Sequence, residues 1–113
     1  MKKIFKILAL GFTFSSVVVM PITQVQAAPY FSTTAEATAK ATKLGYTKIT
    51  ERSNGQAVYQ ATKSAVVKGL PYITPDVDSH NGGAWKAASS VARLGSKVTR
   101  LGTYDENLNR IGD

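Results

Sequence analysis

An uncharged stretch, Ile7–Met20, divides the sequence and limits how much chain is left to fold. It is 14 residues long, it follows three lysines, and Val25 and Ala27 come after it at the spacing of a small-residue cleavage site. This order is typical of a secretory signal peptide, and the stretch is shorter than the roughly 18–20 residues of a membrane-spanning helix. The sequence therefore predicts a cleavable signal peptide at 1–27, cleavage before Ala28, and a secreted, extracellular protein.

The part after the predicted cut, 28–113, is 86 residues long and contains no cysteine. This length fits one domain with a modest core, which must form without disulfide bonds. Three of the 14 Lys and Arg precede the cut, so 11 remain against 7 Asp and Glu, a net charge of +4. A basic small domain suits a polyanionic partner such as nucleic acid or an anionic membrane surface. We expect no stable membrane association after cleavage, because no second apolar run of spanning length follows.

The first half of this domain has the signals of a helix followed by a hairpin. Thr33–Glu36 fits a capping box at the start of an Ala-rich helix, and Gly45 follows that helix in the C′ position. Residues 46–51 favour an extended strand, and Asn54-Gly55 is a turn signal because both residues accept positive φ. Val58-Tyr59 is then expected in the returning strand.

The second half predicts further strands and a second helix. Residues 70–74 indicate a strand, and 84–94 indicate a helix in which Trp85 shares a face with two alanines. A long strand is expected at 97–104 and a short one around Ile111. The predicted fold is α+β: an N-terminal helix followed by a small antiparallel sheet with one inserted helix.

Residues 74–86 contain two acids, the single histidine, a Gly pair, the single tryptophan and a lysine. Such a segment can be a polar loop after a Pro-Asp turn, because Asp and Asn favour turns through local hydrogen bonds. It can also be a site, because a histidine near carboxylates acts as a general acid or base near neutral pH. Asp76, Asp78 and His80 could instead bind a divalent metal ion. These residues alone leave the three interpretations open.

Two arginine motifs follow, Arg100-Leu101-Gly102-Thr103 and Arg110-Ile111-Gly112-Asp113. Together with Asp76-Val77-Asp78 and His80, in this order, they resemble the bacterial toxin 21 family, whose domains stand at the C-termini of polymorphic toxins. The resemblance covers most of 28–113. It implies the fold shared by barnase, EndoU, the colicin E5 and D nuclease domains and RelE, and it implies cleavage of RNA without a metal ion or other cofactor.

The resemblance also implies roles for single residues, in a reaction in which a 2′-hydroxyl attacks the adjacent phosphorus. We assign proton transfer to His80 and the orientation of His80 to Asp78. Lys86 and Arg100 would hold the phosphate and stabilise the developing charge. The remaining predicted site residues are Asp76, Thr103, Arg110 and Asp113. Thr103 would hydrogen-bond the backbone or the substrate. Arg110 and Asp113 would form an ion pair that fixes the terminus, and Arg110 would contact a second phosphate.

Two assignments within these motifs have alternatives. Arg93-Leu94-Gly95-Ser96 also fits the Arg-x-Gly-Ser/Thr pattern, but Arg100 is preferred because Arg93 lies where the predicted helix ends. The paired lysines of the family can correspond to Lys63, Lys68 or Lys86, and the pattern does not choose among them.

The predicted protein is a monomeric secreted toxin with an RNA substrate and a cognate immunity protein, acidic where it covers the basic site. Two other functions fit the residues. One is a metal-dependent nuclease that uses Asp76, Asp78 and His80 as ligands, which EDTA would inactivate. The other is a non-enzymatic cationic protein that binds cell-wall polymers or membranes, whose toxicity would survive His80→Ala.

Overall fold

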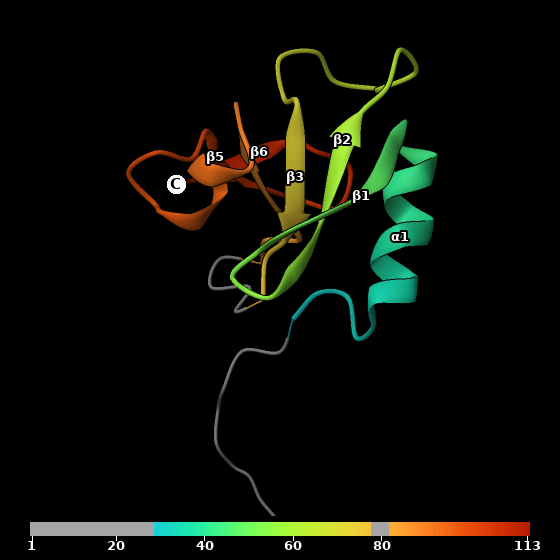
Figure 1. Cartoon of the computed structure of the whole chain (residues 1–113), viewed down its shortest axis with the longest axis horizontal. Coiled ribbons are helices and arrows are strands. Elements are labelled where there is room, and N and C mark those ends of the chain that lie inside the picture. The colour runs from blue at the N-terminus through green and yellow to red at the C-terminus, as the bar shows by residue number, and fades with distance from the viewer. Residues whose placement is uncertain (1–28, 78–81) are drawn as a thin grey trace, which may run out of the picture.

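The computed structural model describes residues 29–77 and 82–113, which form one α-helix and a six-stranded antiparallel sheet (Figure 1). The sheet order is β1-β2-β3-β4-β5-β6, so each strand pairs with its neighbours in the chain. The elements are α1 (Thr34–Lys43), β1 (Tyr46–Ser53), β2 (Gln56–Ala61), β3 (Tyr72–Pro75), β4 (Trp85–Ala88), the 3-10 helix η2 (Ala92–Gly95), β5 (Gly102–Tyr104) and β6 (Arg110–Gly112).

The predicted α+β class, a helix followed by an antiparallel sheet, is confirmed. The predicted signal peptide at 1–27, and Asp78 and His80 of the predicted site, lie outside the described residues. Across 29–77 and 82–113, no helix is long and apolar enough to cross a membrane.

The helix α1 begins and ends at the predicted residues. The Thr33 hydroxyl accepts a hydrogen bond from the Glu36 N–H at 3.1 Å. The Glu36 carboxylate accepts from the hydroxyl and the backbone N–H of Ser32, one residue before the cap, and these two bonds lower the pKa of Glu36. Gly45 follows with φ +89°, and a Cβ there would collide with the backbone of Ser64. The chain therefore needs glycine at this turn into β1.

The prediction of a helix at 84–94 is wrong. Residues 85–88 are β4, at the centre of the sheet, and only Ala92–Gly95 form a helical turn. The side chains of β4 alternate: those of Trp85 and Ala87 pack in the core beside α1, whereas Ala88 packs with Leu94 on the other face. Alanine has a high intrinsic helix propensity, but pairing with β3 and β5 on both sides outweighs it.

The prediction of a long strand at 97–104 is also wrong. Residues 97–99 form a turn, in which the Arg100 N–H donates to the Ser96 carbonyl at 3.1 Å, and β5 begins at Gly102. By contrast, the first hairpin forms as expected around Asn54-Gly55, where both residues have positive φ.

The larger core cluster lies between α1 and the sheet. Trp85 is fully buried, and its ring lies 4.7 Å from that of Phe31 and 5.7 Å, edge-on, from that of Tyr59. A smaller cluster of Val58, Ala88 and Leu94 covers part of the opposite face, which we call the outer face.

Tyr46 provides a pH-dependent test of the larger cluster. Its buried hydroxyl donates to the Leu70 carbonyl at 2.6 Å. Burial, with a smaller contribution from Tyr104, raises the pKa of Tyr46 from 10.0 to about 12. Because the folded state holds this proton more tightly, the resulting stabilisation is complete below pH 10 and is lost as the pH rises towards 12.

We therefore expect one tyrosine to ionise late in an alkaline titration followed by tyrosinate absorbance. Tyr46→Phe should remove that late step and also lower stability by about 1–3 kcal/mol, because the Leu70 carbonyl loses its donor. Tyr30→Phe, at a half-exposed ring, is the control. A late step that persists in Tyr46→Phe would contradict the assignment.

Candidate active site

Lys86 and Asp76 meet on the outer face. Antiparallel pairing sets Thr74 of β3 opposite Lys86 of β4, and the Asp76 N–H donates to the Ala84 carbonyl at 2.8 Å just beyond β3. Because side chains alternate along a strand, Asp76 shares a face with Thr74 and Lys86. The Lys86 Nζ lies 3.5 Å from the Asp76 Oδ1, and the two side chains are 18% and 3% exposed. The pair is thus an ammonium held at a nearly buried carboxylate.

Thr103 completes this group from the next strand. It is directly opposite Lys86 in the β4–β5 pair and is 7% exposed. Gly83 lies between Thr103 and Asp76, because a Cβ on Gly83 would collide with the Thr103 methyl group and the Asp76 carboxylate. Three predicted site residues from three different strands or strand ends, Asp76, Lys86 and Thr103, therefore lie together, and we call them the Lys86 cluster.

Gly83 is a site residue that the motif pattern does not predict. A Gly-Gly pair in a sequence is more typical of a loop, so the pair at 82–83 predicts a loop and does not mark Gly83 as a site residue. The close approach of two side chains explains why Gly83 in particular must lack one.

The structure also distinguishes the three candidate lysines. Lys63 and Lys68 are exposed in the connection between β2 and β3, which joins β3 at Tyr72. Asp76 follows the opposite end of β3, so Lys86 is the candidate beside the acidic segment.

Arg100 has a structural partner. Its Nη1 donates to the Leu94 carbonyl of η2 at 3.3 Å, and its buried Nε has no hydrogen-bond partner among the described residues. Arg100 and Thr103 do not lie in one regular strand, because Arg100 precedes β5 and Thr103 is within it. Gly102 links the two with φ +138°, and a Cβ there would collide with the Arg110 Nε.

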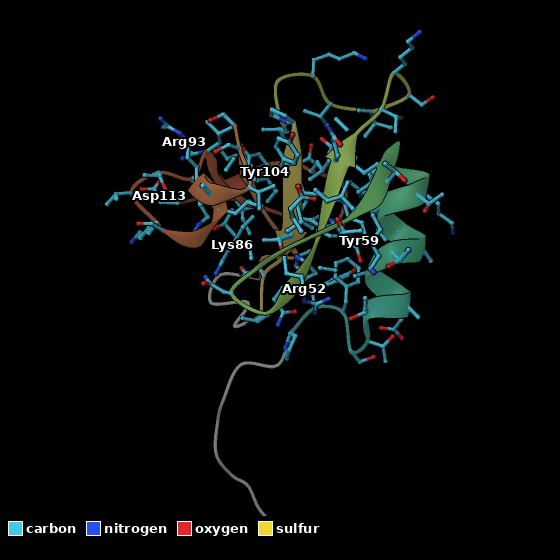
Figure 2. The ribbon with its side chains drawn as sticks, in the orientation of Figure 1. Arg52, Tyr59, Lys86, Arg93, Tyr104 and Asp113 are labelled. Carbon is cyan, nitrogen blue, oxygen red and sulfur yellow. The ribbon has the colours of Figure 1, made fainter. Side chains whose placement is uncertain are left out.

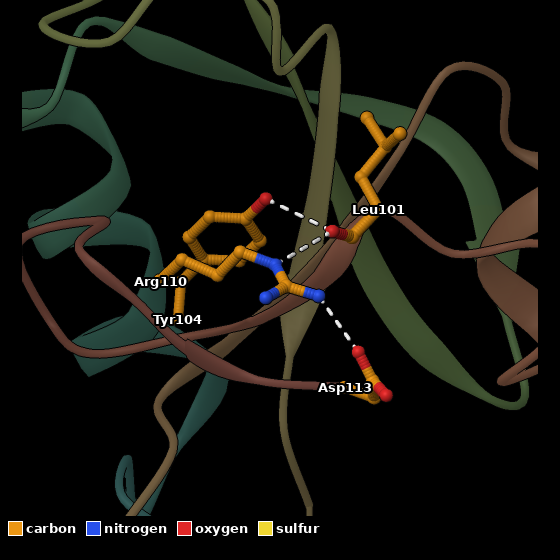
Figure 3. A network of polar contacts seen from close by, with 4 residues as sticks. All are labelled: Leu101, Tyr104, Arg110 and Asp113. Carbon is orange, nitrogen blue, oxygen red and sulfur yellow. Dashed lines mark hydrogen bonds and ion pairs between the residues drawn. The ribbon is translucent and has the colours of Figure 1, made fainter.

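Arg110 and Asp113 form the expected ion pair, with the Nη2 and Oδ1 atoms 2.7 Å apart. The Arg110 Nε also donates to the Leu101 carbonyl at 3.2 Å, and the Tyr104 hydroxyl donates to the same oxygen (Figure 3). Arg110 is opposite Tyr104, which is opposite Trp85, so Arg110 is on the core face of the sheet. The structure therefore does not bring Arg110 and Asp113 into the Lys86 cluster.

The β5–β6 turn that positions Arg110 is organised by Asp105. Its carboxylate accepts from the backbone N–H groups of Asn107 and Asn109 and from the Asn109 side chain. Burial acts to raise the pKa of Asp105, but these hydrogen bonds outweigh it and lower the pKa overall. The turn is thus stabilised above the ordinary pKa of Asp105 and weakens as the pH falls below it.

The described residues contain no group of three or more His, Cys, Asp or Glu side chains that could hold a metal ion. Two of the three ligands of the alternative metal site, Asp78 and His80, lie outside those residues, so the metal alternative stays untested.

A family model described as novel toxin 21 matches residues 39–113 of this chain. The chain belongs to the novel toxin 21 family. The family predicted from the acid-His and arginine motifs is therefore confirmed, and this toxin contributes the Lys86 cluster and both arginine motifs from within the matched range.

Two similar proteins are both from Enterobacter cloacae. The toxin is 45% identical over 62 residues to a curated protein named 16S rRNA endonuclease CdiA, from the subspecies cloacae. The match covers 54% of this chain and only 2% of that much longer protein. A solved structure described as the CdiA-CT/CdiI toxin and immunity complex is 38% identical, with a TM-score of 0.47, and the match covers 72% of this chain and 99% of that one.

Proposed function

We propose that this toxin is a secreted endoribonuclease that cleaves RNA without a metal ion. The observation that carries the proposal is the Lys86 cluster, where a lysine ammonium is fixed 3.5 Å from a nearly buried carboxylate. Asp78 and His80 come two and four residues after Asp76 in the chain. The name of the similar Enterobacter cloacae protein, an rRNA endonuclease, supports RNA as the substrate class.

The proposed reaction is a transesterification. The 2′-hydroxyl oxygen forms a bond to the adjacent phosphorus, its proton passes to a base, and the 5′-oxygen leaves and takes up a proton. The products are a 2′,3′-cyclic phosphate and a 5′-hydroxyl. His80 is the residue suited to proton transfer, and Asp78 is suited to orient it.

Lys86 has the role of stabilising charge on the phosphorane. Its contact with Asp76 restricts where the ammonium points, so little reorganisation is needed when the negative charge develops. The Thr103 hydroxyl, across the β4–β5 pair, can donate to a phosphate oxygen beside it.

The proposal includes export through residues 1–27 and an immunity partner. A toxin that cleaves RNA endangers the cell that makes it, so a protein that blocks the Lys86 cluster is required before export. Such a partner is expected to be acidic where it meets the basic domain, and an immunity protein is named in the Enterobacter cloacae complex.

Incubation of the purified secreted protein with total RNA and with DNA, each with and without EDTA, tests the function. We expect RNA cleavage that persists in EDTA, cyclic phosphate ends on the products, and intact DNA. His80→Ala should abolish the cleavage. RNA left intact in every buffer, or DNA cut only when Mg²⁺ is present, would show the proposal to be wrong.

A further inference from the structure

The positive charge of the domain is concentrated in one segment. Between residues 79 and 104 there are four Lys and Arg and no Asp or Glu. The rest of 28–113 has seven Lys and Arg and seven Asp and Glu, so its charges cancel. The four cations, Lys86, Arg93, Lys97 and Arg100, therefore account for the whole net charge of +4.

Two of these cations are exposed and have no partner within the described part of the chain. Lys86 contacts Asp76, and Arg100 donates to the Leu94 carbonyl. The side chains of Arg93 and Lys97 are exposed and make no hydrogen bond or ion pair with residues 29–77 or 82–113. Their charges are thus available to a ligand.

The backbone that carries them is held in place. Leu94, 1% exposed, packs on Val58 and Ala88, and the Thr99 hydroxyl donates to the Arg93 carbonyl at 2.8 Å. The Leu101 N–H then joins the segment to the Ala87 carbonyl of β4, also at 2.8 Å. These contacts reduce the entropy that would be lost when a ligand orders residues 93–100.

The segment lies on the same face of the sheet as the Lys86 cluster. Leu94 covers Ala88, and Ala88 is two residues from Lys86 in β4, so their side chains project from the outer face. Figure 2 shows Arg93 at the upper left and Lys86 lower and nearer the centre, both on the side of the molecule away from α1. A polyanion that reaches Lys86 can continue along the outer face to residues 93–100.

We infer that residues 93–100, through Arg93 and Lys97, bind the phosphate backbone of the RNA beside the cleavage site. The inference rests on the proposed function and adds a positioning surface to it. Arg93 and Lys97 hold the strand without contacting the reacting phosphate, and such contacts give affinity that depends on salt but not on base sequence.

The test measures binding separately from cleavage. An RNA oligonucleotide with 2′-O-methyl groups lacks the nucleophile of the proposed reaction, and its affinity is measured over a range of KCl concentrations. The test variant is Arg93→Gln/Lys97→Gln. The control is Lys43→Gln/Lys48→Gln, which removes the same charge from exposed residues of α1 and β1.

We expect the test variant to reduce the slope of log affinity against log salt by about 2, one for each lost phosphate contact. Over a fourfold rise in salt the original protein should therefore lose about 16-fold more affinity than the variant. The control variant should keep the original slope, and cleavage by the test variant should show a raised KM with an unchanged kcat.

Equal slopes for the test and control variants would overturn the inference, because total charge and not residues 93–100 would then determine binding. If the original protein cleaves RNA but the test variant keeps the original slope, the inference is wrong and the proposed function is unaffected. If the test variant has the reduced slope but the original protein does not cleave RNA, the binding surface is supported and the proposed nuclease function is wrong.

Discussion

Lys86→Ala is expected to lower kcat for RNA cleavage by about 10²–10³, the loss seen when one preorganised group that stabilises transition-state charge is removed. The expected reason is that the phosphorane then faces the Asp76 carboxylate without the ammonium at 3.5 Å. Single-turnover cleavage of a defined RNA measures the effect. Lys63→Ala, in the exposed connection between β2 and β3, is the matched control and should retain full activity.

A second variant separates catalysis from stability, because removal of Lys86 also takes a cationic neighbour from a nearly buried carboxylate. Asp76→Asn/Lys86→Gln removes both charges and should melt closer to the original protein than Lys86→Ala does. We still expect it to be inactive. Normal cleavage by this stable double variant would mean that the Lys86 cluster is structural.

Trp85→Ala is expected to lower the free energy of unfolding by about 3–5 kcal/mol, because it leaves a large cavity between α1 and the sheet. Domains of this size are stable by only about 5–15 kcal/mol, so up to about half of the folded population can be lost. Urea unfolding followed by circular dichroism is the measurement, since Trp85 is the only tryptophan and fluorescence would lose its reporter.

Val98→Ala is the control for Trp85→Ala, because Val98 is 89% exposed and its truncation creates no cavity. Its unfolding midpoint should match that of the original protein. If Trp85→Ala and Val98→Ala unfold at the same urea concentration, the ring does not hold the core together as described.

The parts of the fold that the sequence predicts correctly have local causes. Thr33 and Glu36 define the start of α1 through hydrogen bonds to near neighbours, and Asn54-Gly55 forms a turn through its own backbone preferences. β4 has no such local signal. Its Ala-rich residues favour a helix when considered alone, and they become a strand because β3 and β5 provide partners on both sides.

The same contrast between local signals and distant partners applies to the candidate site. Asp76 and Lys86 were predictable as candidates because acids, histidine and lysine are close in the chain. Their contact, and that of Thr103, depends on strand register, which no short motif encodes. The position of Arg110 on the core face depends on an irregularity in the β5–β6 register at Thr103 and Tyr104, so its separation from Lys86 could not be predicted.

The order of the strands has a consequence for how the chain acquires its structure. Every strand pairs with the strand before or after it, so the sheet can grow one hairpin at a time from α1 to β6. Each step closes only a short loop, and topologies rich in such local contacts fold faster than those that need distant segments to meet. With no cysteine in the sequence, no slow thiol oxidation accompanies folding. The topology thus favours rapid refolding of an extended chain without oxidising enzymes.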